Sequence, residues 1–364
     1  MATPAAGFTE KEYRITGVLS QQPRLGLAAS AAAIALSLAY LSLFDFPTFA
    51  GWVAFVMLAL IPAQVVLVVL APGALSTLRQ PARGAALVLI TVTAAVAISP
   101  LAVRLVGEGV SPPGPIPTHY FVIVVPTTFF LAIAFGGWPF TLVSRNRWLV
   151  ALLALAASYG ITYVLFRTLF NYEAMRGAPV YLSSAPHGLF DAVWVLVFYV
   201  TVLAGMFVPL HFDLWPLTRV PALMRQPVLG LVWMGVAIAI AAAVMAVAGA
   251  VGMDPMFVLT RVTAPFIFGT IIVLNMLQNS LFAAVARQPL KGVLNVGVAA
   301  FGGLALASLF QWMAPVVVGP LPSGPPGYEA EIWLVNALLS VTFPFLVYLA
   351  ACFEFWPFTR RHAQ

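Results

Sequence analysis

The stretch 353–359 reads FEFWPFT and is followed at once by Arg360 and Arg361. Related stretches occur twice before it, as FDLWPLT at 212–218 and as GGWPFT at 136–141. Each copy closes a long apolar run and precedes basic residues. A proline disfavours helical angles at the residue before it, and indole rings favour the membrane interface. Each copy therefore predicts that a membrane-spanning helix ends at or near its tryptophan.

The composition is that of a polytopic membrane protein. Hydrophobic residues make up 62% of the 364 residues and charged residues 8%, against about 45–50% and 25% in soluble domains. Apolar runs of about 20 residues can cross the hydrocarbon core as helices. Runs such as 231–251 are apolar on every face, which excludes the alternating strands of a barrel. We therefore expect an all-α integral membrane protein.

Apolar stretches predict about ten transmembrane helices, arranged as five hairpins. They lie at 25–43, 50–70, 84–105, 119–136, 147–170, 189–210, 228–251, 257–282, 292–313 and 331–352. Short basic joints follow the even-numbered helices, so that 13 of the 17 basic residues fall on one side. The positive-inside rule places this side, with both termini, in the cytoplasm. The arginine- and alanine-rich composition favours a bacterial cytoplasmic (inner) membrane.

A second repeated signature opens four of the five odd-numbered helices. It consists of Gln-Pro with a glycine three residues after the proline, at 22–23, 80–81, 226–227 and 288–289. Proline is tolerated in the first turn of a helix because its missing N–H would have no partner there. The signature therefore predicts helix starts, and Asn146 takes its place before the remaining odd-numbered helix.

The outer loops, which join each odd-numbered helix to the next even-numbered one, group the hairpins. Hairpins 1 and 4 have short loops, whereas hairpins 2 and 5 have proline-rich loops at 111–119 and 319–328. We predict a parallel 4 + 2 + 4 duplication, because each repeated unit has an even number of helices. Its parts are a cytoplasmic tail at 1–20, four-helix units at 21–142 and 223–364, and a connecting hairpin at 143–222. In architecture, though not in motif, this loosely resembles the membrane subunits that bind quinone in respiratory complexes.

Amides within the apolar runs are candidates for a solute path. Asn275, Gln278 and Asn279 have the i, i+3, i+4 spacing that places side chains on one face of a helix. Gln64 matches Asn275 when the two four-helix units are aligned. Such amides either hydrogen-bond neighbouring helices or line a path for a substrate or ion.

Two acidic residues, Asp213 and Glu354, stand two residues before the tryptophan in two copies of the repeated stretch. A carboxylate at the C-terminal end of a helix faces the unfavourable end of the helix dipole, so each should have a partner. Arg219 and Arg360 lie nearest in the sequence and predict interfacial ion pairs. The alternative is a proton-handling or ligand site built from His211, Asp213 and Glu354.

Basic residues near the outer ends of helices form a third group, Arg104, Arg167 and Arg261. Each is expected to extend toward lipid headgroups, and Arg104 has Glu108 at i+4 as a local partner. The alternative is an outward-facing basic cluster that attracts an anion. The longest outer loop, 171–191, is a candidate for a lid or partner contact, or is a simple tether.

Missing motifs exclude several classes of function. The chain has no P-loop, so it does not itself power transport with ATP. It has neither HExxH, GxSxG nor a histidine box, so we predict no catalytic residue, no metal and no cofactor. Cys352 is the only cysteine, which excludes an internal disulfide. An enzyme acting through His211 and Asp213 at the cytoplasmic interface is a third alternative.

The leading hypothesis is a permease or channel-like protein that moves a small solute without its own ATPase, with Gln64 and the amides of the eighth helix nearest the path. The alternative is a non-catalytic anchor or scaffold subunit of a larger membrane complex, including a respiratory, quinone-linked one. The expected partners are the lipid bilayer and either partner subunits or further copies of this chain. Nucleic acid is not expected, because the net charge of +6 is spread between the apolar runs.

Overall fold

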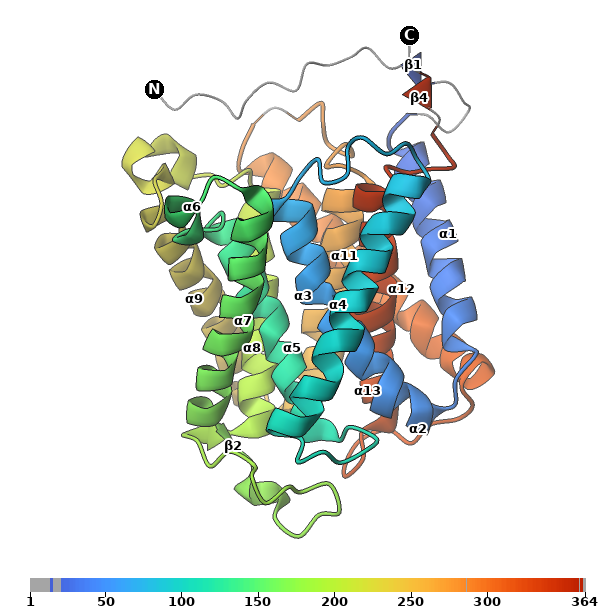
Figure 1. Ribbon diagram of the computed structural model, residues 1–364, viewed down its shortest axis with the longest axis vertical. Coiled ribbons are helices and arrows are strands. Elements are labelled where there is room, and N and C mark those ends of the chain that lie inside the picture. Colours follow the sequence, from blue (N-terminus) through green and yellow to red (C-terminus); the bar gives the residue numbers. More distant parts are fainter. Residues whose placement is uncertain (1–13, 16–20, 286, 360, 363–364) are drawn as a thin grey trace.

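The computed structural model describes residues 14–15, 21–285, 287–359 and 361–362. These residues contain ten helices long and apolar enough to cross a membrane, which stand side by side as one bundle (Figure 1). Spans 1 to 10 are Arg24–Leu41, Phe46–Leu70, Ala82–Val106, Pro115–Ala134, Arg147–Leu169, Ala192–His211, Val228–Ala250, Pro255–Met276, Leu290–Val317 and Glu329–Cys352. The predicted all-α architecture of about ten membrane helices is confirmed.

Odd-numbered spans are single α-helices, whereas most even-numbered spans contain π-helical turns. The odd-numbered spans are α1 (Arg24–Leu41), α4 (Ala82–Val106), α7 (Arg147–Leu169), α9 (Val228–Ala250) and α12 (Leu290–Val317). The α-helices of the even-numbered spans are α2 (Phe46–Thr48), α3 (Ala54–Leu70), α5 (Pro115–Phe129), α8 (Ala192–His211), α10 (Pro255–Val258), α11 (Ala264–Ile271), α13 (Glu329–Val335) and α14 (Phe343–Val347). The π turns between or after them are Phe49–Val53, Phe130–Ala134, Leu259–Thr263, Ile272–Met276, Asn336–Thr342 and Tyr348–Cys352.

Short elements complete the described part of the chain. They are α6 (Phe140–Val143) and the 3₁₀ turns Glu173–Met175, Leu217–Arg219 and Pro221–Met224. Strand β1 (Arg14–Ile15) pairs antiparallel with β4 (Arg361–His362), and β2 (Phe170–Asn171) pairs parallel with β3 (Phe190–Asp191). Figure 1 places the β1–β4 pair and β2 at opposite ends of the bundle.

Burial divides the spans into two layers. The even-numbered spans bury 61–78% of the residues in their most apolar stretches, and the odd-numbered spans only 22–39%. We call the two sets the inner spans and the outer spans. Large apolar side chains on the outer spans, such as Leu89, Phe301 and Trp312, are exposed, as expected for surfaces that contact lipid. The outer spans are thus apolar on every face because one face packs on protein and the other meets the bilayer.

The inner spans close into a ring. Each contacts the next inner span in the chain, and span 10 returns to span 2. Every outer span packs against the inner span that precedes it around the ring and against the inner span before that one, and spans 3, 7 and 9 also contact the inner span that follows them. The pairs are span 1 on spans 10 and 8, span 3 on 2 and 10, span 5 on 4 and 2, span 7 on 6 and 4, and span 9 on 8 and 6. All five hairpins share this contact pattern, so it does not single out two larger units, and the 4 + 2 + 4 duplication stays a prediction.

The Gln-Pro signature joins outer spans to inner spans. Spans 1, 3, 7 and 9 begin directly after it, as predicted, and its peptide bonds are cis. The side-chain amides donate to backbone carbonyl oxygens at the ends of distant inner spans: Gln22 to Met276 (3.0 Å), Gln80 to Cys352 (2.7 Å) and Gln226 to Ala134 (2.8 Å). The last carbonyls of a helix lack partners within the helix. Each of these three glutamines therefore satisfies a helix end and helps to fix which inner span its outer span contacts. The fourth, Gln288, donates instead to Oδ2 of Asp213 (2.9 Å), which follows span 6.

Span 5 begins without this signature. Asn146 caps it instead, since its Oδ1 accepts hydrogen bonds from the backbone N–H groups of Trp148 (3.0 Å) and Leu149 (3.4 Å). Asparagine is among the preferred N-cap residues. The break in the repeated pattern therefore replaces a contact between hairpins by a local cap.

Spans 8 and 9 approach each other backbone to backbone at two glycines. A Cβ atom on Gly269 would overlap the carbonyl oxygen of Ala299, and one on Gly303 would overlap that of Pro265. The neighbouring Gly302 has open space where its Cβ would be. Glycine is thus required on one side of this helix and not on the other.

Candidate functional site

The ring of inner spans surrounds a cavity of about 250 Å³. All five inner spans line it, each with residues from its first half, for example Gly51, Val122, Val200, Met256 and Leu339. The lining continues into the outer loop before span 4, at Pro113 and Gly114. The cavity therefore opens toward the outer loops, and we call it the central cavity.

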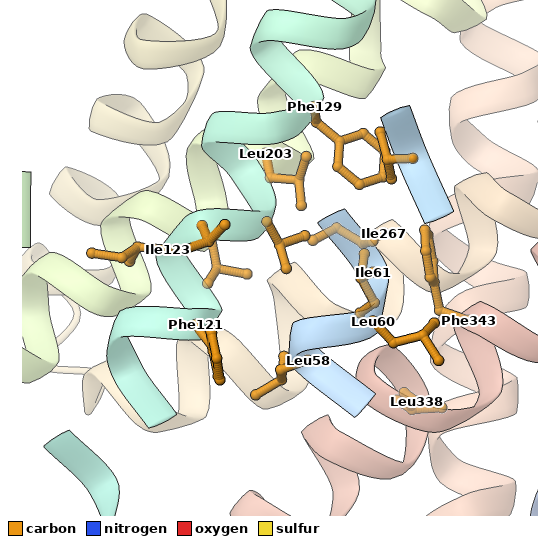
Figure 2. Close-up of a cluster of buried hydrophobic side chains, with 14 of the residues drawn as sticks. Leu58, Leu60, Ile61, Phe121, Ile123, Phe129, Leu203, Ile267, Leu338 and Phe343 are labelled. Atoms are coloured by element: carbon orange, nitrogen blue, oxygen red, sulfur yellow. The ribbon is translucent and has the colours of Figure 1, made fainter. Parts of the chain in front are cut away.

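The end of the central cavity that lies away from the outer loops is closed by one apolar side chain from each inner span. These five residues, the floor, are Ile61, Phe129, Leu203, Ile267 and Phe343, and all are labelled in Figure 2. Each is at most 5% exposed. The rings of Phe129 and Phe343 meet edge to face with centroids 6.0 Å apart. The floor therefore separates the cavity from the opposite face of the bundle.

Three of the four polar residues that line the cavity are satisfied within their own helices. The hydroxyl of Thr118 donates to the carbonyl oxygen of Gly114 (2.9 Å). The amide of Asn336 donates to the carbonyl of Ile332 (2.9 Å), and its Oδ1 accepts from the hydroxyl of Ser340 (2.7 Å). Their hydrogen-bonding capacity is partly used, so these groups make the wall less polar than unpaired groups would.

His119 is the fourth polar residue of the cavity wall. Its Nδ1 lies 3.0 Å from the hydroxyl of Tyr172, and the two rings are stacked with centroids 5.9 Å apart. In the described part of the chain, Nε2 of His119 has no hydrogen-bond partner. This nitrogen is therefore available to a molecule in the cavity.

Tyr172 belongs to the outer loop 171–191 and is fully buried. Its ring packs against Phe166 and Phe170, with centroids 6.0 Å and 6.2 Å apart. Burial raises the pKa of the Tyr172 phenol well above its usual value, so the hydroxyl stays protonated. His119 is its hydrogen-bond partner, and a buried hydroxyl hydrogen needs an acceptor. We therefore assign the tyrosine as donor to Nδ1, which leaves the proton of a neutral imidazole on Nε2.

π turns shape the wall of the cavity in three inner spans. Lining residues fall within the π turns Phe49–Val53, Leu259–Thr263 and Asn336–Thr342. Such turns are rare and occur frequently at functional sites. They are a structural signal that hydropathy and residue spacing do not carry.

The prediction that the three amides lie on one face of the eighth helix is wrong. Span 8 ends at Met276, and Gln278 and Asn279 follow it in left-handed backbone conformations with φ of 49° and 56°. The same two-residue left-handed turn follows other inner spans, at Gly136–Gly137, Asp213–Leu214 and Glu354–Phe355. Residues 278 and 279 are therefore a further copy of the repeated stretch that lacks Trp-Pro to mark it.

The four amides do not line the central cavity. Asn275 is exposed on the last turn of span 8, and Oδ1 of Asn279 accepts from Nδ2 of Asn295 (2.6 Å). Gln64 is fully buried, and its Nε2 donates to the carbonyl of Pro344 in span 10 (3.0 Å). These bonds join neighbouring helices. A role of the amides in a solute path stays a prediction.

The two acidic residues have partners on outer spans from other hairpins. Oε1 of Glu354 lies 2.6 Å from Nη1 of Arg83, and Oδ2 of Asp213 lies 3.1 Å from Nζ of Lys291. The predicted pair with Arg219 is wrong, because that guanidinium lies over the Trp215 ring, 5.5 Å from its centroid. The other predicted partner, Arg360, lies outside the described residues.

His211 contacts a neighbouring inner span. It is fully buried, and its Nε2 lies 3.0 Å from the hydroxyl of Thr270. Asp213 follows span 6 and Glu354 follows span 10, with span 8 between them in the ring. A single site built from His211, Asp213 and Glu354 is therefore not formed in this structure.

The three outer arginines do not line the central cavity either. Nη1 of Arg167 donates to the carbonyl of Ser184 (2.7 Å). The predicted pair of Arg104 with Glu108 is not seen in the described part of the chain. Glu108 instead accepts from the Ser183 hydroxyl (2.8 Å) and from the backbone N–H of Ser184, which lowers the pKa of its carboxyl. These bonds hold the outer loop 171–191 against the bundle.

Comparison of this chain with protein-family models, curated protein sequences and solved structures gives no match. The chain is a polytopic membrane protein, and its inner spans surround an apolar cavity.

Proposed function

We propose that this protein is a permease or channel-like protein that binds a small, largely apolar molecule in the central cavity and moves it through the ring of inner spans. The observation that carries this proposal is the cavity itself, which all five inner spans line and the floor closes. A cavity that is enclosed by a ring of helices and closed at one end has the shape expected of a path that is open at its other end. Movement of the floor side chains would complete the path.

The lining also indicates the chemistry of the molecule. Among the lining residues there is no Asp, Glu, Lys or Arg, and an ion without a charged or strongly polar partner pays a large desolvation cost. Among the described lining residues, Nε2 of His119 has no hydrogen-bond partner, and the amide of Asn336 has one N–H besides the one that donates to Ile332. A neutral apolar molecule with one hydrogen-bond acceptor, such as a carbonyl oxygen, fits this wall.

Binding can be tested with two probes of similar shape, 2-acetylnaphthalene and 2-ethylnaphthalene, of which only the first has an acceptor. We expect the wild-type protein in detergent to bind the ketone about fivefold more tightly, as one net hydrogen bond is worth about 1 kcal/mol. His119→Phe should remove this preference and keep the binding of the hydrocarbon. Fluorescence titration measures both affinities. Equal affinities of the wild-type protein for the two probes would contradict the assignment of His119.

The path can be tested separately through the floor. Hydrophobic constrictions close a pore by excluding water, so the double variant Phe129→Ala and Phe343→Ala should release entrapped erythritol from proteoliposomes several-fold faster than wild type. Phe301→Ala, which removes an exposed ring on the lipid-facing side, is the matched control. If the folded double variant leaks no faster than the control, the ring axis is not a path.

The second candidate is a non-transporting anchor or scaffold subunit. It is supported by the outer loop 171–191, which extends beyond the ends of the helices near β2 (Figure 1) and exposes Leu189 and Phe190. Exposed neighbouring apolar side chains are typical of a contact with another protein. A stoichiometric partner that co-purifies in mild detergent and is lost on Leu189→Ser with Phe190→Ser would favour this candidate.

The orientation is also part of the proposal. The basic joints follow the inner spans, on the side of the bundle that holds the β1–β4 pair (Figure 1). The positive-inside rule supports a cytoplasmic location for this side. The central cavity would then open away from the cytoplasm.

A further inference from the structure

A second cavity, of about 200 Å³, lies between spans 8, 9 and 10. Polar residues on its wall include Arg261, Ser308, Gln311 and Glu331, and apolar ones include Leu304 and Ala307. Span 9 is an outer span, so this cavity lies on the lipid-facing side of the ring. We call it the lateral pocket.

The lateral pocket lies at the depth where lipid headgroups meet acyl chains. Arg261 is six residues from the start of span 8 at Pro255, and Gln311 is six residues from the end of span 9 at Val317. At 1.5 Å per residue both lie about 9 Å inside the outer ends of their helices. An arginine at this depth needs an anion or water at its guanidinium group.

The structure leaves the charge of Arg261 available to a ligand. Its guanidinium carbon lies 5.4 Å from the centroid of the Phe257 ring, and in the described residues it has neither a hydrogen bond nor an ion pair. Glu331 shares the pocket but is bonded elsewhere, since its carboxylate accepts from the Ser323 hydroxyl and from the backbone N–H of Gly324.

A second donor faces the same cavity. Gln311 lines the pocket and has no hydrogen-bond partner in the part of the chain that the structure describes. Its amide N–H groups and the guanidinium of Arg261 together match the oxygens of a phosphate group. The carboxyl group of Glu331 also lies on the wall, which favours a phosphodiester with one charge over inorganic phosphate with two.

We propose that the lateral pocket binds an anionic phospholipid, with its phosphodiester on Arg261 and Gln311. Leu304 lines the pocket and is 42% exposed, and Phe301, one turn earlier in span 9, is 78% exposed. These side chains continue the pocket toward the bilayer centre and supply an apolar surface for an acyl chain. The lipid would thus bridge spans 8, 9 and 10, whatever the central cavity binds.

Native mass spectrometry of the purified full-length protein with dioleoyl phosphatidylglycerol tests this proposal. We expect Arg261→Gln to weaken lipid binding about tenfold or more, because charge-assisted hydrogen bonds to phosphate are lost, and Arg261→Lys to weaken it less. Arg104→Gln, which removes an exposed arginine at the outer end of span 3, should leave binding unchanged.

Two outcomes would overturn the proposal. Equal binding by Arg261→Gln and wild type, with both folded by circular dichroism, would show that the pocket does not hold the lipid phosphate. Displacement of the lipid by millimolar inorganic phosphate would show a site for a free anion instead. Neither result depends on binding or leakage through the central cavity.

Discussion

Gly303→Leu is expected to destabilise the protein by about 4 kcal/mol or more, an effect seen only for severe changes in packed cores. A Cβ at this position would overlap the carbonyl oxygen of Pro265 and would lie 3.2 Å from the backbone nitrogen of Gly269. Backbone atoms cannot rotate away as the end of a side chain can, so spans 8 and 9 would have to separate. The yield of monodisperse protein in mild detergent and the midpoint of thermal unfolding measure the effect.

The matched control for this variant is one residue away. Gly302→Leu adds the same side chain to the same helix, where no atom lies within 4 Å of the new Cβ. We expect its unfolding midpoint to stay close to that of wild type. Similar midpoints for the two variants would contradict the close contact between spans 8 and 9.

Reversal of the charge at Glu354 is the second change with a large expected effect. Glu354→Lys places two positive charges where Arg83 and Glu354 now meet at 2.6 Å, with side chains only 17% and 24% exposed. This burial lies between that of an exposed and that of a fully buried ion pair, so we expect the free energy of unfolding to fall by about 2 kcal/mol. The double variant Arg83→Glu with Glu354→Lys should recover at least half of this loss. Chemical unfolding in detergent measures the stability of both variants.

The equivalent pair in the ring supplies the comparison. The side chain of Asp213, which pairs with Lys291, is 53% exposed. Asp213→Lys should therefore lower the free energy of unfolding by only about 1 kcal/mol or less. A double variant at Arg83 and Glu354 that is no more stable than Glu354→Lys alone would show that the two charges do not interact.

These pairs show what sequence reasoning could and could not reach. Hydropathy and the repeated Trp-Pro and Gln-Pro stretches predict the spans and their ends, because both signals are local. The partner of Asp213 lies 78 residues away, and proximity in the sequence favoured Arg219 instead.

The sequence nevertheless contains a signal for the correct partners. Of the four Gln-Pro signatures, two carry a basic residue three positions after the glutamine, Arg83 and Lys291, and these outer spans dock beside the two acids.

The ring and its cavity were not predictable for a physical reason. Inner and outer spans are both apolar on every face, since lipid and protein interior are equally apolar environments, so periodicity does not reveal which spans lie inside. Nothing in the sequence marks His119 as a residue of a site. Its assignment as a donor to the cavity depends on Tyr172, which reaches it from an outer loop. The amides of residues 278 and 279 were misplaced because their turn lacks the tryptophan and proline of its other copies.

Because the ring is closed, the number of hairpins sets the width of the central cavity. Each hairpin adds one inner span to the circumference and one outer span to brace it, so the diameter of the enclosed space follows from how many hairpins are joined and not from the size of individual side chains. For the function proposed above, substitutions at the floor would therefore adjust selectivity only within that limit, and a much larger ligand would require a sixth hairpin rather than smaller residues.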